Sequence, residues 1–173
     1  PPPGSGSRFR RPGDPGVFYG AEAVRTACAE VGYWRWRFLR DSPGLERIDP
    51  KPQTVFRAAV ASPAIDLRKP PYLRRRRQWT DPNDYQACQA LAARARQAGV
   101  GLIRYQSVRD PEQGGAAAVL TPAAFTQPAP LAIETWFLGV DHARVRWAQE
   151  PLLGGSLGFE FPTTEWIRAL AAG

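Results

Sequence analysis

The opening stretch SRFRRPGDPGVFYG, residues 7–20, sets Arg8, Arg10 and Arg11 beside two Gly/Pro turns and a short apolar strand. Arginine is the side chain best matched to phosphate, because its planar guanidinium donates paired hydrogen bonds and keeps its charge at neutral pH. Glycine in the turns lets a ligand approach the backbone closely. The stretch therefore fits a pyrophosphate group, although composition alone favours a solvated basic terminus.

Glu30 is a candidate for stabilising a positive charge. Helical spacing places it beside Ala27 and Trp34, at the edge of an apolar stripe, so its carboxylate would lie near the core. There it could stabilise the charge that develops on a ribose ring when a glycosidic bond breaks. Taken alone, Glu30 is more simply explained as a surface glutamate paired with Arg25 or Arg37.

Ser107 ends a strand expected over residues 100–107 and precedes a glycine-containing turn, a common place for a polar group to meet a ligand. It has no G-x-S-x-G surroundings, and the one histidine, His142, falls in an expected hairpin turn, which argues against a Ser-His-acid hydrolase. We interpret Ser107 as a hydrogen-bonding residue rather than a nucleophile. The sequence also lacks the glycine-rich Rossmann and P-loop motifs and a second histidine, which argues against those folds and a metal hydrolase.

Two helices are expected to position these residues. The first runs from Glu22 to about Asp41, and its expected apolar face consists of Val24, Ala27, Cys28, Val31, Trp34 and Phe38. The second begins at TDPND, with Asp81 as its cap and Pro82 at its first position. Its expected buried stripe consists of Tyr85, Cys88, Leu91, Ala92 and Ala95. Gly99 suits the end of this second helix.

The remaining segments favour an α+β fold. Alternating or apolar runs predict strands over residues 17–19, 54–61, 100–107, 133–140, 143–149 and 158–161. Residues 62–80, which hold several prolines, are expected to form a surface loop, and residues 163–172 a closing helix. Because helices come early and antiparallel strands cluster late, an α+β domain is favoured over a doubly wound sheet.

Bulk composition narrows the class of protein. The 173 residues are 43% hydrophobic, which suits one domain over residues 1–173 with a flexible segment at 1–6, and an upstream segment is expected to be missing. Cys28 and Cys88 show neither disulfide nor zinc spacing, so a reducing cytoplasm fits best. No apolar run of about 18 residues and no signal peptide occur, so no membrane role is expected.

The net charge of +7 suits an anionic partner such as a nucleotide, a nucleic acid or an acidic protein. The run Arg74–Arg77 could dock an acidic protein partner, cover phosphates or bind nucleic acid, although most such runs are solvated. The alternative function is therefore a basic nucleic-acid-binding module without catalytic activity, whose affinity would fall steeply with salt. Aromatic residues at periodic core positions, rather than interleaved with exposed basic residues, argue against it.

Three blocks taken together resemble the RES domain, the toxin half of many bacterial toxin–antitoxin pairs. They are SRFRRPGDPGVFY with Arg8, TACAE with Glu30, and LAARARQAGVGLIRYQSVRDP with Ser107. The likeness extends from residue 7 to about 148. The chain departs from the family pattern at Ser7, which replaces a glycine, and in lacking the strand that commonly precedes the first block.

The resemblance implies a fold similar to ADP-ribosyltransferase toxins, with a split antiparallel sheet gripping NAD, and an activity that breaks the nicotinamide–ribose bond without a metal. The acceptor is phosphate in an NAD phosphorylase, water in a glycohydrolase, and a protein side chain in an ADP-ribosyltransferase. The implied partner is a cognate Xre-like antitoxin whose C-terminal segment blocks the pocket, and no direct nucleic-acid role is expected. A catalytically inactive scaffold of the same fold is less attractive, since Arg8, Glu30 and Ser107 are all present.

The same resemblance implies roles for individual residues. Arg8 would hold a phosphate or a ribose hydroxyl, Glu30 would stabilise the ribosyl cation, and Ser107 would orient ribose or carboxamide. Two tyrosines and one further arginine are candidates for NAD binding, namely Tyr19, Tyr105 and Arg109. The tyrosines would stack on nicotinamide or belong to the core. Arg109 would reach the pyrophosphate or form a surface ion pair with Asp110 or Glu112.

Overall fold

Two four-stranded sheets organise the chain in the computed structural model, which describes residues 6–149 and 157–171. The strands of the first sheet are, in order, β1 (Phe18–Ala21), β5 (Gly115–Val119), β4 (Leu102–Gln106) and β3 (Ala64–Asp66). Those of the second are β2 (Arg47–Arg57), β6 (Ala132–Asp141), β7 (Arg144–Gln149) and β8 (Gly158–Pro162). All neighbouring strands are antiparallel except β3 and β4, which are parallel.

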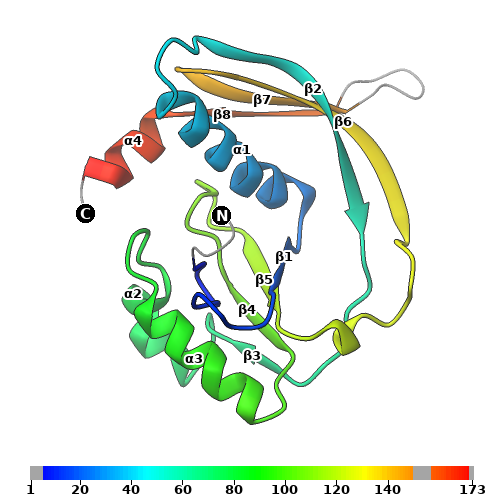
Figure 1. Ribbon diagram of the computed structural model, residues 1–173. Helices are drawn as coiled ribbons and strands as arrows, with labels where there is room; N and C mark the ends of the chain where they lie inside the picture. Colours follow the sequence, from blue (N-terminus) through cyan, green and yellow to red (C-terminus); the bar gives the residue numbers. More distant parts are fainter. Residues whose placement is uncertain (1–5, 150–156, 172–173) are drawn as a thin grey trace.

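Four α-helices accompany the sheets within the described ranges. They are α1 (Val24–Arg40), α2 (Arg76–Trp79), α3 (Gln86–Gln97) and α4 (Thr164–Ala171). Helix α1 lies between the two sheets, with α4 beside it, whereas α2 and α3 accompany the first sheet (Figure 1). The α+β class predicted from the sequence is therefore confirmed. None of the described helices is long and apolar enough to cross a membrane.

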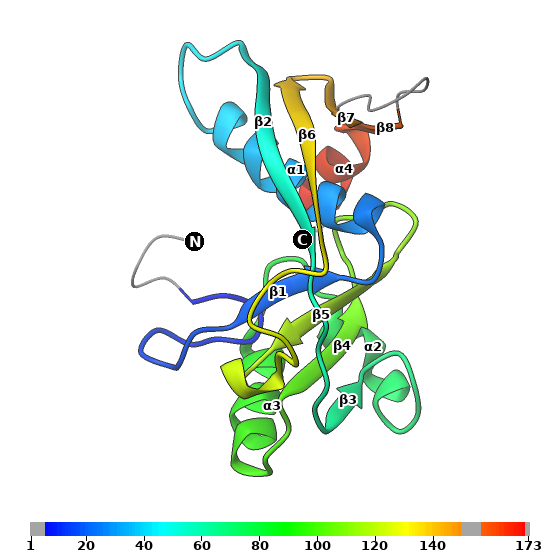
Figure 2. The ribbon, with the colours of Figure 1, turned by 90° about the vertical axis from the view of Figure 1, so that its right-hand side faces the viewer.

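The buried side chains form two separate cores, one on each sheet. Figure 2 shows the two sheets with their helices as a lower and an upper body. The first core combines the first sheet with α2 and α3, and its large members include Phe9, Trp79, Leu91, Ile103 and Tyr105. The second core combines the second sheet with α1 and α4, and its large members include Tyr33, Trp36, Trp136, Trp147 and Trp166. A single domain over residues 1–173 stays a prediction, and the flexible segment expected at residues 1–6 lies outside the described residues except for Gly6.

The face that α1 buries differs in part from the predicted face, of which Cys28 is buried and Val24 packs against the second core as expected. Val31, Trp34 and Phe38 were expected in the core but are 43%, 52% and 59% exposed. The helix instead buries a second stripe that includes Tyr33 and Trp36, packed against β6 and β7. Periodicity could not choose between the stripes because both carry large aromatic residues. The exposed Val31 and Trp34 are therefore available to line a cavity.

Gly32 explains why α1 can pack so closely on the second sheet. A Cβ atom at this position would lie 2.8 Å from Cγ1 of Val145, closer than real side chains approach. Glycine in a helix interior costs about 1 kcal/mol relative to alanine, so its presence here reflects the close contact with β7. The helix is thereby held firmly on the second core.

Helix α3 begins later than predicted. Asp81 does not cap it: its Oδ1 accepts hydrogen bonds from the backbone N–H groups of Asn83 and Asp84 at 2.8 and 2.7 Å, which closes a turn before the helix starts at Gln86. The buried stripe is confirmed at Cys88, Leu91, Ala92 and Ala95, whereas Tyr85 is half-buried. Gly99, with φ +71°, follows the end of the helix as expected.

One loop prediction and one strand prediction also need correction. Residues 62–80 are not a plain loop, because they contain β3, a 3₁₀ turn at Tyr72–Arg75 and α2. The strand predicted at 54–61 starts earlier, at Arg47, because an edge strand tolerates prolines such as Pro50 and Pro52. The predicted hairpin is confirmed as β6 and β7, and the last strand and closing helix as β8 and α4.

Candidate active site

A hollow of about 500 Å³ lies where the first sheet faces α1. Its walls come from the N-terminal segment, β1, α1, the end of β4 and the loop after β4. Five of the six site residues predicted from the sequence line it, namely Arg8, Tyr19, Glu30, Tyr105 and Arg109. The sixth, Ser107, lies directly behind Glu30. All six predicted residues are thus gathered around one cavity.

Glu30 projects from α1 and is joined to Ser107 across 77 positions of sequence. The Ser107 hydroxyl donates a hydrogen bond of 2.5 Å to Oε1 of Glu30. Burial raises the pKa of the Glu30 carboxyl, while the Ser107 hydrogen bond and the charges of Arg109 and Arg8 act in the opposite direction. Glu30 is therefore a carboxyl group in a poorly solvated site, where one hydroxyl and two arginines partly offset the cost of ionising it.

The Ser107 hydroxyl takes part in three hydrogen bonds with its neighbours. The residue is completely buried, and its Oγ accepts hydrogen bonds from the backbone N–H groups of Arg109 at 3.2 Å and Asp110 at 3.0 Å. Its single hydrogen is left for Glu30. In this geometry Ser107 acts on the carboxylate and does not face the hollow.

Arg8 and Arg109 are both buried, and both line the hollow. Arg8 donates from Nη1 to the carbonyl of Trp79 at 3.0 Å and lies 4.6 Å from the ring centre of Tyr85. Arg109 donates from Nη2 to the carbonyl of Pro82 at 2.9 Å and stacks 3.9 Å from the ring centre of Tyr33. Carbonyls and aromatic faces hold both cations in place, and their charges favour the ionised form of Glu30.

Arg109 does not form the surface ion pair that was the alternative interpretation. Asp110 and Glu112 both pair with Arg25 instead, so Arg109 keeps its charge for the cavity. The expected pairing of Glu30 with Arg25 or Arg37 is wrong for the same reason, since Arg37 pairs with Asp41.

Asp110 is a site residue that the sequence reasoning missed. Its buried carboxylate accepts hydrogen bonds from Arg25 and, at 2.8 Å, from the hydroxyl of Thr26. These bonds tie the loop after β4 to the first turn of α1. Because that loop holds Ser107 and that helix holds Glu30, Asp110 fixes the distance between them. An acidic residue three positions after Ser107 was the one available signal.

The two tyrosines have different surroundings. Tyr19 is half exposed, and its hydroxyl accepts a hydrogen bond from the backbone of Phe9 at 2.9 Å and lies 2.8 Å from Oγ of Ser7. Tyr105 is buried in the first core with its ring 4.9 Å from that of Phe9. Tyr19 therefore offers a ring surface to a ligand, whereas Tyr105 is mainly a core residue that touches the cavity wall.

A comparison with known families identifies the family of the chain. The RES domain matches residues 1–148, so the chain belongs to the RES domain family. A search of curated proteins finds no match to the chain. Within residues 6–149 and 157–171, no group of three or more His, Cys, Asp or Glu side chains is placed to hold a metal ion.

Proposed function

We propose that this RES domain protein is an enzyme that consumes NAD by breaking the bond between nicotinamide and ribose. The observation that carries the proposal is the hydrogen bond from Ser107 to Glu30, beside a hollow that Arg8 and Arg109 also line. A carboxylate for a cation and two guanidinium groups for phosphates are the functional groups that such a substrate requires.

The bond between nicotinamide and ribose breaks as nicotinamide leaves in its neutral form and its electron pair departs with it. Positive charge then develops on the ribose ring, and the ionised carboxylate of Glu30 would stabilise it. Few waters compete in a half-buried site, so this interaction is stronger than in solution. Ser107 acts as a positioning residue, because its hydroxyl holds Glu30 and favours the ionised form.

The remaining groups would bind the rest of the nicotinamide nucleotide. Arg8 or Arg109 would hold a phosphate, and the half-exposed ring of Tyr19 would stack on nicotinamide. The two antiparallel-rich sheets with a cavity at their junction support a fold similar to ADP-ribosyltransferase toxins. We further propose that the enzyme acts as a cytoplasmic toxin, and that a cognate Xre-like antitoxin neutralises it by blocking the cavity.

The direct test is incubation of the purified chain with NAD, with and without inorganic phosphate, followed by quantification of nicotinamide. We expect nicotinamide release, and mass spectrometry of the products identifies the acceptor. A phosphorylated ADP-ribose indicates phosphate, free ADP-ribose indicates water, and an added ADP-ribosyl mass on protein indicates a side chain. Binding of NAD without any release of nicotinamide would refute the enzyme assignment.

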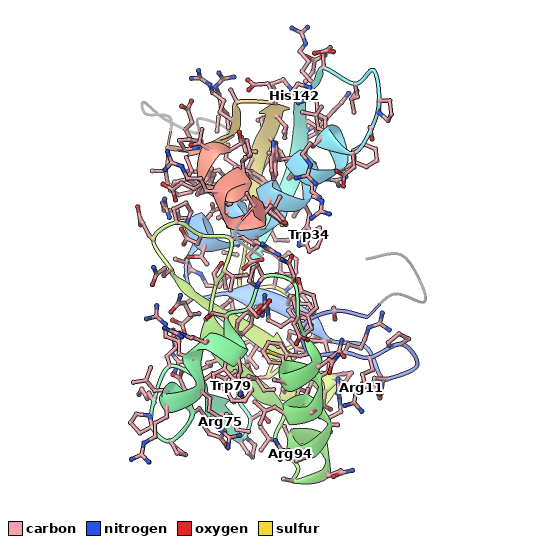
Figure 3. All side chains as sticks on the ribbon, turned by 90° about the vertical axis from the view of Figure 1, so that its left-hand side faces the viewer. Arg11, Trp34, Arg75, Trp79, Arg94 and His142 are labelled. Atoms are coloured by element: carbon pink, nitrogen blue, oxygen red, sulfur yellow. The ribbon has the colours of Figure 1, made fainter. Side chains whose placement is uncertain are left out.

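The nucleic-acid-binding alternative depends on the arginine run of the surface around α2. Arg74, Arg75 and Arg77 are exposed, whereas Arg76 is hydrogen-bonded to Gln106 and Gln113. Arg75 lies on the lower body, well away from Trp34 at the level of the cavity (Figure 3). Salt-sensitive binding to DNA or RNA together with no NAD turnover would favour this alternative.

Replacing Ser107 by alanine is expected to move the acid limb of the pH–rate profile to higher pH. The Ser107 hydrogen bond lowers the pKa of Glu30, so its loss raises that pKa further, and a higher pH is needed to ionise the carboxyl. The change also leaves two buried backbone N–H groups without their acceptor, which costs about 1–3 kcal/mol of stability. Nicotinamide release measured across pH checks the shift.

Ser42 provides the matched control, because its hydroxyl is exposed and bonds only the carbonyl of Phe38. Ser42→Ala should leave the pH profile unchanged. An unchanged acid limb in Ser107→Ala would show that Ser107 does not lower the pKa of Glu30.

A further inference from the structure

The stripe of α1 that faces the cavity continues beyond Glu30. Ala27, Glu30, Val31 and Trp34 all line the hollow, at the i, i+3, i+4 and i+7 positions of one helix face, and Arg35 lies four residues after Val31. Three of these residues, Ala27, Val31 and Trp34, belong to the stripe that sequence periodicity assigned to the core. Its exposure leaves an aromatic ring and a cation one helical turn away from the carboxylate.

Arg35 differs from the other arginines of α1 in having unoccupied donors. Arg25 pairs with Asp110 and Glu112, and Arg37 and Arg40 both bond Asp41. Arg35 is exposed at the cavity, and within the described part of the chain it makes no hydrogen bond or ion pair. A guanidinium with free donors at the edge of a cavity is well suited to a phosphate group.

Trp34 offers a flat surface beside this cation. Its side chain is about half exposed, and its ring meets that of Tyr33 edge to face at 5.2 Å between centroids. Figure 3 shows Trp34 at the narrow level between the two bodies, where the cavity lies. The Arg109 guanidinium lies 6.0 Å from the centre of the Trp34 ring, and the ring stays half exposed. A half-exposed indole beside a cation can stack on a planar base.

On the basis of the proposed function, we propose that Trp34 and Arg35 form the subsite for the adenylate half of NAD. Arg35 would bind the pyrophosphate and Trp34 would stack on adenine, while the nicotinamide ribose lies at Glu30. Residues four apart on a helix lie one turn along its axis, so the substrate would follow the stripe of α1 from its reacting end to its base.

A second hollow, of about 590 Å³, adjoins the first and could receive the same half of the substrate. Tyr19, Ala27 and Val31 line both hollows. The ionisable residues around the second hollow include two glutamates, Glu22 and Glu134, and one arginine, Arg57.

Charge distinguishes the two hollows. Three arginines and one glutamate line the first hollow, namely Arg8, Arg35, Arg109 and Glu30. The first hollow therefore carries the positive balance that a doubly charged pyrophosphate requires, and the second does not.

The test compares Trp34→Ala and Arg35→Ala on two substrates. NAD carries the adenylate, whereas nicotinamide riboside has the same scissile bond without phosphates or base. We expect the KM for NAD to rise about tenfold in each variant, as for the loss of one strong contact, with kcat within about threefold of wild type. Turnover of nicotinamide riboside should not change.

Matched controls lie on the same helix outside both hollows. Arg40→Ala removes an equal charge, and Phe38→Ala removes an exposed aromatic ring one turn beyond Trp34. Both should retain the wild-type KM for NAD. Equal losses on NAD and nicotinamide riboside, or a rise in KM for Phe56→Ala in the second hollow but not for Arg35→Ala, would overturn the subsite.

Calorimetry with ADP-ribose separates this inference from the proposed function. ADP-ribose lacks nicotinamide, so its binding does not depend on catalysis. If wild type releases no nicotinamide, the proposed function fails, but weaker ADP-ribose binding by Arg35→Ala than by Arg40→Ala still supports the subsite. Equal binding by these two variants, or no binding by wild type, would refute it.

Discussion

Replacing Glu30 by glutamine is expected to lower kcat for nicotinamide release by about 10³-fold, the scale seen when one preorganised electrostatic group is removed from an active site. Glutamine keeps the size of the side chain and an oxygen that can accept the Ser107 hydrogen bond, so the loss isolates the negative charge. Single-turnover measurements with saturating NAD report this step directly. Wild-type activity in the variant would remove Glu30 from the mechanism.

The same substitution is expected to make the protein more stable. Burial raises the pKa of Glu30, so the folded state holds a proton more tightly than the unfolded state does. Stability is therefore lost as pH rises through the interval between the ordinary and the raised pKa, and glutamine escapes this loss. The two proteins should have similar melting temperatures at low pH, and the variant should have the higher one at pH values above the raised pKa.

Thermal melts across pH check this expectation, and a difference of 1 kcal/mol corresponds to about 2–4 °C for a chain of this size. Glu46→Gln is the control, because that carboxylate is exposed and its removal should change the melting temperature little. A lower melting temperature for Glu30→Gln at high pH would mean that the attraction of Arg8 and Arg109 outweighs the cost of burial.

Replacing Asp110 by alanine is expected to reduce the free energy of unfolding by about 1–3 kcal/mol, because the buried Thr26 hydroxyl is left without an acceptor, while the partly exposed Arg25 keeps only its pair with Glu112. Arg25 loses its buried partner and the Thr26 hydroxyl loses its acceptor. Nicotinamide release should also fall, since the loop that carries Ser107 is no longer tied to α1. Urea denaturation and the NAD assay measure the two effects.

Asp41 supplies the comparison, because it is an exposed carboxylate bonded to Arg37 and Arg40. Asp41→Ala should cost less than about 1 kcal/mol, as exposed ion pairs do. Asp110→Asn, which keeps an acceptor for Thr26, should lie between the two. Equal losses for Asp110→Ala and Asp41→Ala would show that Asp110 does not hold the loop.

The sequence predicted those parts of the fold that local signals determine. The hairpin of β6 and β7, the stripe of α3 and the glycine after it follow from alternation, periodicity and turn chemistry. The buried face of α1 did not follow, because the choice between two aromatic stripes depends on the second sheet, which is distant in sequence. The start of α3 was missed because Asp81 closes a turn instead of capping the helix.

The meeting of Arg8, Glu30 and Ser107 was expected only from the resemblance to the RES domain. No periodic pattern relates positions separated by 77 residues, and Glu30 alone was better explained as a surface residue. Asp110 and Arg35 were missed for a related reason. Asp110 matters because it contacts Arg25 and Thr26, and Arg35 matters because its donors have no partner within the described residues. The spacing of residues in the sequence predicts neither property.

The loop after β4 extends the first sheet, yet it is fastened to the second core. Trp166 donates to the carbonyl of Arg109 at 2.7 Å, and Tyr33 supports the guanidinium of the same residue. Glu30 and Arg109 thus lie where two separately packed bodies meet, and a ligand bound in the hollow would contact both bodies. Misplacement by about 1 Å can cost about 100-fold in rate. On the proposed function, an inhibitor that moves the two bodies slightly apart would therefore abolish activity without contacting Glu30.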